Sequence, residues 1–144
     1  MTRTAEVTSR IMASVPNANT RPELALRSAL HRRGLRYRVH RRMLGKPDIT
    51  FVAPRVAVFV DGDYWHGNAW RTRGYADFDS YYARGENGAF WADKIRRNTE
   101  RDRHVTEGLS ADGWCVIRVW ETDLTTQLDA IVDRIEAAVR DRTP

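Results

Sequence analysis

The pattern of apolar and polar positions predicts a helix followed by three short strands. The helix is predicted over residues 20–34, where Thr20 can act as its N-cap and Glu23 follows three residues later. The three strands are predicted at residues 35–39, 48–52 and 56–60. The first of them alternates and should form an edge whose apolar side faces the core. The third is apolar throughout, which is typical of a central strand.

The second half of the chain predicts two helices and one more strand. Residues 67–86 have no clear periodicity and are expected to form a long loop of the kind that often carries function. A helix over residues 87–111, a strand over 114–121 and a last helix from about Asp123 follow. This order predicts an α/β fold, with a mixed central β-sheet flanked by helices, for a single domain over residues 20–144.

Composition fits a globular protein and argues against several classes. The 144 residues, 42 % of them hydrophobic, are enough for one domain with its own core. A single cysteine cannot form an intrachain disulfide. No stretch approaches the roughly 20 apolar residues of a membrane helix, and the N-terminal residues lack the apolar core of a signal peptide. We therefore expect a soluble, cytoplasmic protein.

Positive charge is concentrated in one part of the chain. The formal charge is +5, yet no acid lies between Glu23 and Asp48. The cations of this block are Arg27, Arg32, Arg33, Arg36, Arg38, Arg41, Arg42 and Lys46. Such a block is typical of a surface that binds a polyanion, and also of a solvated basic face. Residues 1–19, polar with scattered arginines, are interpreted as an N-terminal arm that contacts DNA.

Two acids and a histidine suggest hydrolytic chemistry. Asp48 begins one predicted strand and Asp61 ends the next, so an antiparallel pairing would bring both carboxylates to one sheet edge. Such a pair favours a divalent cation such as Mg²⁺. Each residue also has a structural reading: the acids as turn residues, Glu23 as a capping box and His66 as a core histidine. Together with the basic block they match the needs of metal-assisted phosphodiester cleavage.

Two large aromatics follow directly on these acids. Trp65 and Tyr64 are consecutive, and on a strand they would point to opposite faces, so we expect them not to share one core. Core packing is the usual fate of a tryptophan such as Trp91 at the start of the long helix. Beside an acidic site, however, these rings could wedge between DNA bases.

Four ordered segments, "GKPDI", "VFVDGDYWHG", "FWADKIRRNTERD" and "GWCVIRVWE", resemble the very-short-patch repair (Vsr) endonucleases over most of the chain. The resemblance implies a restriction-endonuclease-like fold of the PD-(D/E)xK superfamily. It also implies Mg²⁺-dependent nicking of double-stranded DNA beside a T·G mismatch. Asp48 and the main-chain carbonyl of Val60 match metal ligands, His66 matches the residue acting on the water or phosphate, and Glu23 matches a hydrogen-bonding partner of metal-bound water. Positions implied to contact DNA are Tyr64, Trp65 and Trp91, which would insert beside the mismatch, and Lys94 and Asn98, which would read it.

The sequence departs from the family pattern at two places. Asp61 stands where the family has a histidine, which suggests a second acidic metal ligand, while Asp63 replaces the lysine of the general nuclease plan, so His66 or a metal-bound hydroxide must substitute. The positions that match the family's zinc ligands are Asp63, Asn68, Trp70 and Thr122. Because this is not a cysteine–histidine set, we expect no structural Zn²⁺, and we interpret Cys115 as a core residue.

Three alternatives to a mismatch-repair endonuclease remain. The first is a defence or restriction-type nuclease of the same fold with a different DNA target. The second is a DNA-binding module without catalysis, and the third is a globular domain whose acids only cap turns. A cytosine methyltransferase or mismatch-repair proteins are conceivable partners, and a monomer suffices to nick one strand.

Overall fold

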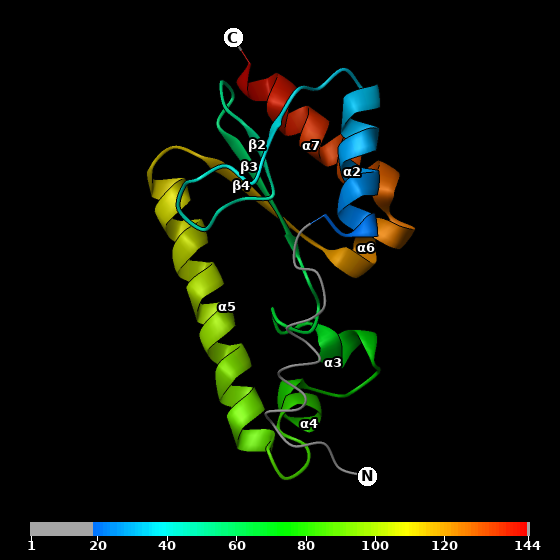
Figure 1. Cartoon of the computed structure of the whole chain (residues 1–144), viewed down its shortest axis with the longest axis vertical. Coiled ribbons are helices and arrows are strands. Elements are labelled where there is room, and N and C mark those ends of the chain that lie inside the picture. The colour runs from blue at the N-terminus through cyan, green and yellow to red at the C-terminus, as the bar shows by residue number, and fades with distance from the viewer. Residues whose placement is uncertain (1–18, 144) are drawn as a thin grey trace.

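The computed structural model describes residues 19–143, and the arm predicted for residues 1–19 lies outside this range except for Asn19. The described part has mixed α/β architecture (Figure 1). Its elements, in chain order, are α2 (Arg21–Arg32), β1 (Arg38–Val39), β2 (Ile49–Phe51), β3 (Val56–Asp61), α3 (Ala69–Thr72), α4 (Phe78–Tyr82), α5 (Gly88–Ala111), β4 (Cys115–Trp120), α6 (Glu121–Thr126) and α7 (Leu128–Arg142). Among these helices, none is long and apolar enough to cross a membrane.

The four strands form one sheet in the order β1-β2-β3-β4. Strands β1, β2 and β3 are connected as antiparallel neighbours, whereas α5 carries the chain across to β4, which runs parallel to β3. This confirms the predicted mixed sheet and the central position of β3. Antiparallel pairing of β2 with β3 places the beginning of β2 beside the end of β3, where the candidate site lies.

Helices cover both faces of the sheet, as predicted (Figure 1). On one face Val56 and Val58 pack with residues of α2, α6 and α7, including the fully buried Leu26 and Ile135. On the other face Phe59 packs against Leu109 of α5. Full burial of each such side chain contributes about 1.5–3 kcal/mol, so the alternation along β3 fixes which way its last residue points.

The N-terminal half of α5 extends away from the sheet and carries a second packed cluster (Figure 1). The predicted loop over residues 67–86 is wrong in part, because it contains α3 and α4. Helix α4 begins at a capping box in which Asp77 accepts from the amide of Ser80 at 2.8 Å. The buried hydroxyl of Tyr82 receives the amide of Ala69 at 3.1 Å and donates to the carbonyl of Tyr64 at 2.6 Å. These local bonds stabilise helices too short to give a periodic signal.

Two other expectations need correction. Val39 of the predicted edge strand is 42 % exposed, because β1 is only two residues long and the chain turns away after it. The last helix is interrupted at Gln127, whose amide bonds to the carbonyl of Asp123 and closes α6 before α7 begins.

Candidate active site

Asp48 lies just before β2 and is held against the end of β3. Its Oδ2 accepts a hydrogen bond from the main-chain amide of Val60 at 2.7 Å. The antiparallel register explains this contact. Because Ile49 pairs with Val58, the residue before Ile49 lies beside the last residues of β3. One carboxylate oxygen is therefore fixed by the sheet and the other, Oδ1, faces the neighbouring side chains.

Glu23, His40 and Asp48 form a compact acidic group from three separate segments. Thr20 caps α2 through the amide of Glu23, which confirms the predicted helix start. The Glu23 side chain is nevertheless only 2 % exposed, with Oε2 accepting from the amide of Asn19 and Oε1 lying 3.5 Å from Nε2 of His40. Nδ1 of the same imidazole lies 3.9 Å from Oδ1 of Asp48.

The electrostatics of this group favour a bound cation. Burial, together with the negative charges of Glu23 and Asp61, raises the pKa of Asp48 to about 7, although the amide of Val60 opposes this. Oε1 of Glu23 is buried without a hydrogen-bond partner among the described residues; its 3.2 Å contact with Arg27 lacks hydrogen-bond geometry. An unsatisfied buried oxygen beside a carboxylate that resists ionisation fits a site for a divalent cation.

A second group lies on the α5 side of the sheet and consists of Asp61, His66 and Asp102. His66 Nδ1 is hydrogen-bonded to Asp102 of α5 and lies 3.7 Å from Asp61 Oδ1. Arg118 of β4 donates through Nη1 to both oxygens of Asp61, at 3.0 and 3.1 Å. Its Nε also donates to Thr106 at 2.7 Å, so the guanidinium joins β4 to α5 directly behind the histidine.

These contacts set the charge of His66. Burial lowers its pKa, but the hydrogen bond to Asp102 and the carboxylate of Asp61 outweigh burial and raise the pKa above its ordinary value. Burial also shifts Asp61, in the opposite direction: it raises the pKa of this carboxyl, whereas the positive charges of His66 and Arg118 lower it. The imidazole is thus held through Nδ1 by Asp102, while Nε2 makes no hydrogen bond among the described residues.

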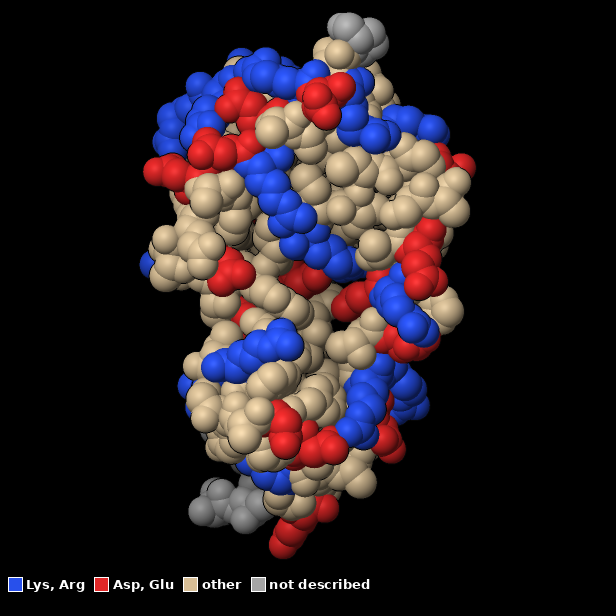
Figure 2. Space-filling view, turned by 180° about the vertical axis from the view of Figure 1, so that it is seen from behind, with Lys and Arg blue, Asp and Glu red and all other residues tan. Residues whose placement is uncertain are grey.

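Asp48 and Asp61 therefore lie in different groups. Asp61 shares the face of Phe59, toward α5, and is engaged by Arg118, whereas Asp48 lies with Glu23 and His40. The two carboxylates still interact electrostatically across the strand end. Joint ligation of one metal ion by both acids stays a prediction. Acidic side chains lie deep in the narrow part of the molecule between the sheet and the second packed cluster, with Lys and Arg on either side (Figure 2). We call this narrow part the waist.

The aromatic residues after β3 form one cluster. Tyr64 and Trp65 are in a turn rather than on a strand, with their rings 5.1 Å apart, and both approach Trp91 at 6.1 Å. The expectation that they could not share one core is wrong, because a turn does not alternate its side chains. Lys94 lies over the Trp65 ring at 5.4 Å, and Asn98 donates to the Trp65 carbonyl at 3.1 Å.

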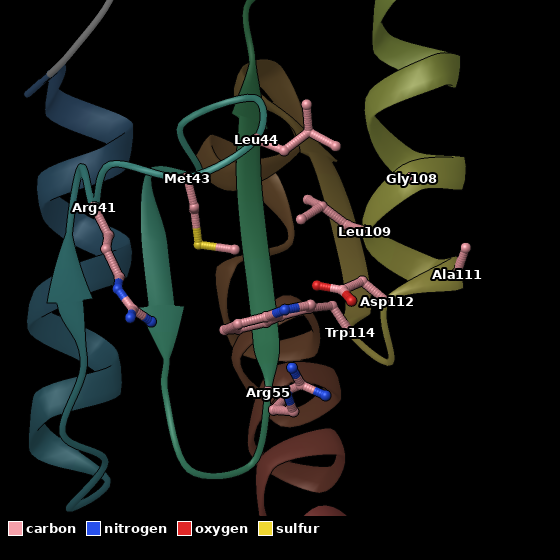
Figure 3. A pocket seen from close by; sticks show the side chains of 9 residues that line it. All are labelled: Arg41, Met43, Leu44, Arg55, Gly108, Leu109, Ala111, Asp112 and Trp114. Carbon is pink, nitrogen blue, oxygen red and sulfur yellow. The ribbon is translucent and has the colours of Figure 1, made fainter.

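A hollow lies elsewhere, at the beginning of β3 and β4 (Figure 3). Its volume is about 570 Å³. It is lined by Arg41, Met43, Leu44, Arg55, Gly108, Leu109, Ala111, Asp112 and Trp114. None of the candidate site residues lines it, so this hollow is separate from the two groups of acids and histidines.

Sequence comparisons agree with this geometry. The profile of the family described as "DNA mismatch endonuclease Vsr" matches residues 2–72. The chain is 40 % identical over 140 residues to the type II nicking enzyme V.NmeDIP of Neisseria meningitidis serogroup C, covering 96 % of this chain and 90 % of that protein. It is 42 % identical over 134 residues to the type II nicking enzyme V.NaeI of Lentzea aerocolonigenes, covering 88 % and 75 %. With the DNA mismatch endonuclease Vsr of Escherichia coli K12 it shares 32 % over 133 residues, covering 89 % and 80 %.

The chain belongs to the Vsr family. It is accordingly a DNA nicking endonuclease of mixed α/β fold, and DNA is its substrate. The acids and histidine of the sheet edge thus stand in an enzyme, and the reading of a plain globular domain is set aside.

Within the Vsr family, the positions matching the zinc ligands are bridged here by hydrogen bonds. Asp63 accepts from the Asn68 side chain at 2.8 Å and from the hydroxyl and amide of Thr122 at 2.9 and 3.2 Å. Trp70 instead packs on the second packed cluster, at the N-terminal half of α5, which we call the distal cluster. Arg71 lies over the Trp70 ring. The carboxylate of Asp63 thereby links the turn carrying the site histidine to the start of α6.

Three neighbours of the site escaped sequence reasoning. Asp102 lies in the quoted segment "FWADKIRRNTERD", but nothing local to it indicates that it faces His66. His40 is the one histidine of the acid-free block after residue 31, and Arg118 is a charge within an apolar strand. A lone charge in a buried strand demands a partner, and this signal could have identified Arg118.

Proposed function

We propose that this protein is a restriction-type nicking endonuclease that cuts one strand of double-stranded DNA at a target of its own, with a divalent cation as cofactor. The carrying observation is the buried Oε1 of Glu23, which contacts Arg27 at 3.2 Å but has no hydrogen bond among the described residues, beside Asp48, whose pKa is raised to about 7. Five type II nicking enzymes are 32–42 % identical to the chain, four of them at 37 % or more, against 32 % for Vsr of Escherichia coli, which supports the restriction-type assignment.

Asp48 and Glu23 would hold the cation, together with the main-chain carbonyl of Val60, and Mg²⁺ is the ion that such oxygen ligands suit. When bound, the cation would neutralise charge on the phosphate and activate a water molecule. His66, oriented by Asp102, presents Nε2 to the scissile phosphate or the attacking water. Arg118 keeps Asp61 neutralised, so that the second acid does not repel the DNA backbone.

The aromatic cluster supports DNA contact beside the cut. The rings of Tyr64, Trp65 and Trp91 pack against one another next to His66. The ammonium group of Lys94 lies over two of these rings. Tyr64 and Trp65 are partly exposed and can enter the base stack of a bent duplex, whereas Trp91 is buried and supports them; the lysine can contact a phosphate. The side chain of Asn98 donates to the Trp65 carbonyl and so helps to position Trp65. The same amide group can also contact a base.

A second candidate is nicking beside a T·G mismatch in very-short-patch repair. The match of the Vsr profile to residues 2–72 and the similarity to Vsr of Escherichia coli favour it. The two candidates share the cutting chemistry and differ in whether the target is mismatched.

End-labelled duplexes with Mg²⁺ separate these candidates. A duplex set with a T·G mismatch in varied flanking sequence is compared with fully paired twins, using the wild type, Asp48→Ala and the exposed-acid control Asp112→Ala. Cutting of one strand that needs Asp48 but not a mismatch supports the restriction-type assignment. Cutting confined to the mismatched strand supports very-short-patch repair. Cutting that survives Asp48→Ala would contradict both.

A further inference from the structure

His40 occupies a position that neither family resemblance nor local pattern singles out. It directly follows β1, and its main-chain amide donates to the carbonyl of Asp48 at 3.2 Å. Its φ is +49°, in the left-handed region that non-glycine residues rarely adopt. Such a conformation costs of order 1 kcal/mol or more and persists where surrounding contacts impose it. Here it turns the imidazole in between the two carboxylates of the acidic group.

The imidazole joins both acids. Nε2 lies 3.5 Å from Glu23 Oε1, which has no hydrogen-bond partner within residues 19–143, and Nδ1 lies 3.9 Å from Asp48 Oδ1. One donor atom from each residue lies within 4.8 Å of the others, a spacing that one ion can bridge. The side chain is 22 % exposed and so remains reachable from solvent.

We propose that His40 is the nitrogen ligand of this metal site, making it a mixed nitrogen–oxygen site that binds first-row transition ions such as Mn²⁺ more tightly than Mg²⁺. The inference rests on the proposed metal dependence and specifies its ligand set. Imidazole favours transition ions over the hard Mg²⁺, which prefers oxygen ligands and water.

Arg27 competes with the ion for the same atoms. Its Nη2 lies 2.9 Å from Nε2 of His40 and 3.2 Å from Oε1 of Glu23. The guanidinium thus supplies positive charge to this group, and a metal ion must displace it from the imidazole. Removing His40 and removing Arg27 should therefore change metal affinity in opposite directions.

Mn²⁺ bound to the full-length protein tests this directly through electron spin-echo spectroscopy, which detects a directly bonded nitrogen. We expect nitrogen coupling in the wild type, replaced by a ¹⁵N pattern after ¹⁵N-histidine labelling. The coupling should vanish in His40→Gln and persist in His66→Gln and in the exposed control His104→Gln. By calorimetric titration, His40→Gln should weaken Mn²⁺ binding at least about tenfold and Mg²⁺ binding less, whereas Arg27→Gln should strengthen both.

Other outcomes separate the two proposals. Nitrogen coupling that survives His40→Gln, or that vanishes only in His66→Gln, overturns the assignment of His40. Wild-type protein that nicks DNA with Mg²⁺ but shows no nitrogen coupling overturns the assignment while the proposed function stands. Protein that neither binds Mn²⁺ or Mg²⁺ nor nicks DNA contradicts both. The wild-type spectrum does not depend on whether any variant folds.

Discussion

At the residue scale, the two acids that the sequence singles out have different neighbours. The closeness of Asp48 to the end of β3 follows from strand order and is predictable from the sequence. The pairing of Asp61 with Arg118 is not, because this guanidinium comes from β4, which is remote in sequence. The partnership of His66 with Asp102 joins residues 36 positions apart and likewise requires the folded structure.

The raised pKa of Asp48 makes the stability of the metal-free protein depend on pH. An aspartate in the unfolded chain titrates near about 3.9, whereas Asp48 titrates at about 7 in the folded state, where it faces Glu23, His40 and Asp61. The folded state therefore binds a proton that the unfolded state has released. Stability from this group is complete below about pH 4 and is lost as the pH rises through 7.

We predict that, without divalent cations, the free energy of unfolding falls by on the order of a few kcal/mol between pH 5 and pH 8. The melting temperature should fall with it. Excess Mg²⁺ should reduce the fall, because the ion binds the ionised carboxylate. In Asp48→Asn the fall should be much smaller, retaining the contributions of Asp61 and His66, whose raised pKa values have the same sign. An unchanged slope in Asp48→Asn would contradict the assignment. Calorimetric melts across this range provide the measurement.

Asp102→Asn tests the orientation of the histidine. The hydrogen bond and charge of Asp102 raise the pKa of His66, so the variant should lower that pKa in an NMR titration of the ring nitrogens. The nicking rate should fall on the order of 10²- to 10⁴-fold, as expected for a mispositioned acid–base residue. The exposed Asp112→Asn should change neither quantity. A normal rate with a shifted pKa would show that His66 does not act in the chemistry.

At the element scale, strong periodicity located most helices and strands but not their interruptions. The predicted helix over residues 87–111 is α5 to within one residue, because its apolar positions face the sheet and the distal cluster. Helices α3 and α4 were missed, since they are short and are held by hydrogen bonds of Tyr82 and by the Asp77 cap. Such contacts between side chain and backbone leave no periodic trace in a sequence.

The hydrogen bonds of Asp63 connect two elements around the site. The carboxylate ties the turn that follows β3 to the N-terminus of α6 through Thr122, and Asn68 stabilises it from the start of α3. We predict that Asp63→Ala lowers the free energy of unfolding by about 1–3 kcal/mol, because these donors lose their acceptor. Urea unfolding measures this, with the exposed Asp112→Ala as control. Equal small effects for both would contradict a linking role.

At the scale of the whole molecule, two packed bodies meet at an acidic waist. The sheet with its covering helices forms one, and α3, α4 and the N-terminal half of α5 form the other (Figure 1). The acids and histidines of the site come from the first body, the turn after β3 and the C-terminal half of α5, whereas Tyr64 and Trp65 pack on the second body. Basic side chains flank the acidic waist (Figure 2). A duplex that lies across the waist would meet cations first and the acids only at the scissile phosphate.

Salt dependence of DNA binding tests this arrangement. Lys94, half-buried over Trp65 and Trp91, should contact a phosphate, so Lys94→Gln should weaken binding and reduce the slope of log affinity against log salt by about one. Arg142→Gln, beside Pro54 and Gly113 at the opposite end of β3 and β4 from the site, should leave the slope unchanged. Fluorescence anisotropy in EDTA measures binding without cutting. Equal changes in both variants would indicate non-specific attraction alone.

The most direct test of a cation-dependent nick is a duplex whose two strands carry different fluorescent labels, cut under single-turnover conditions. Wild type and Asp112→Asn should cut one strand only, in Mg²⁺ and not in EDTA. Asp48→Asn and Glu23→Gln should bind the duplex with unchanged or higher affinity and cut neither strand, because they remove the oxygens that hold the cation and leave the DNA-contacting surface intact. Cutting of both strands, or cutting by Asp48→Asn at the wild-type rate, would contradict a single metal-assisted nick at this sheet edge.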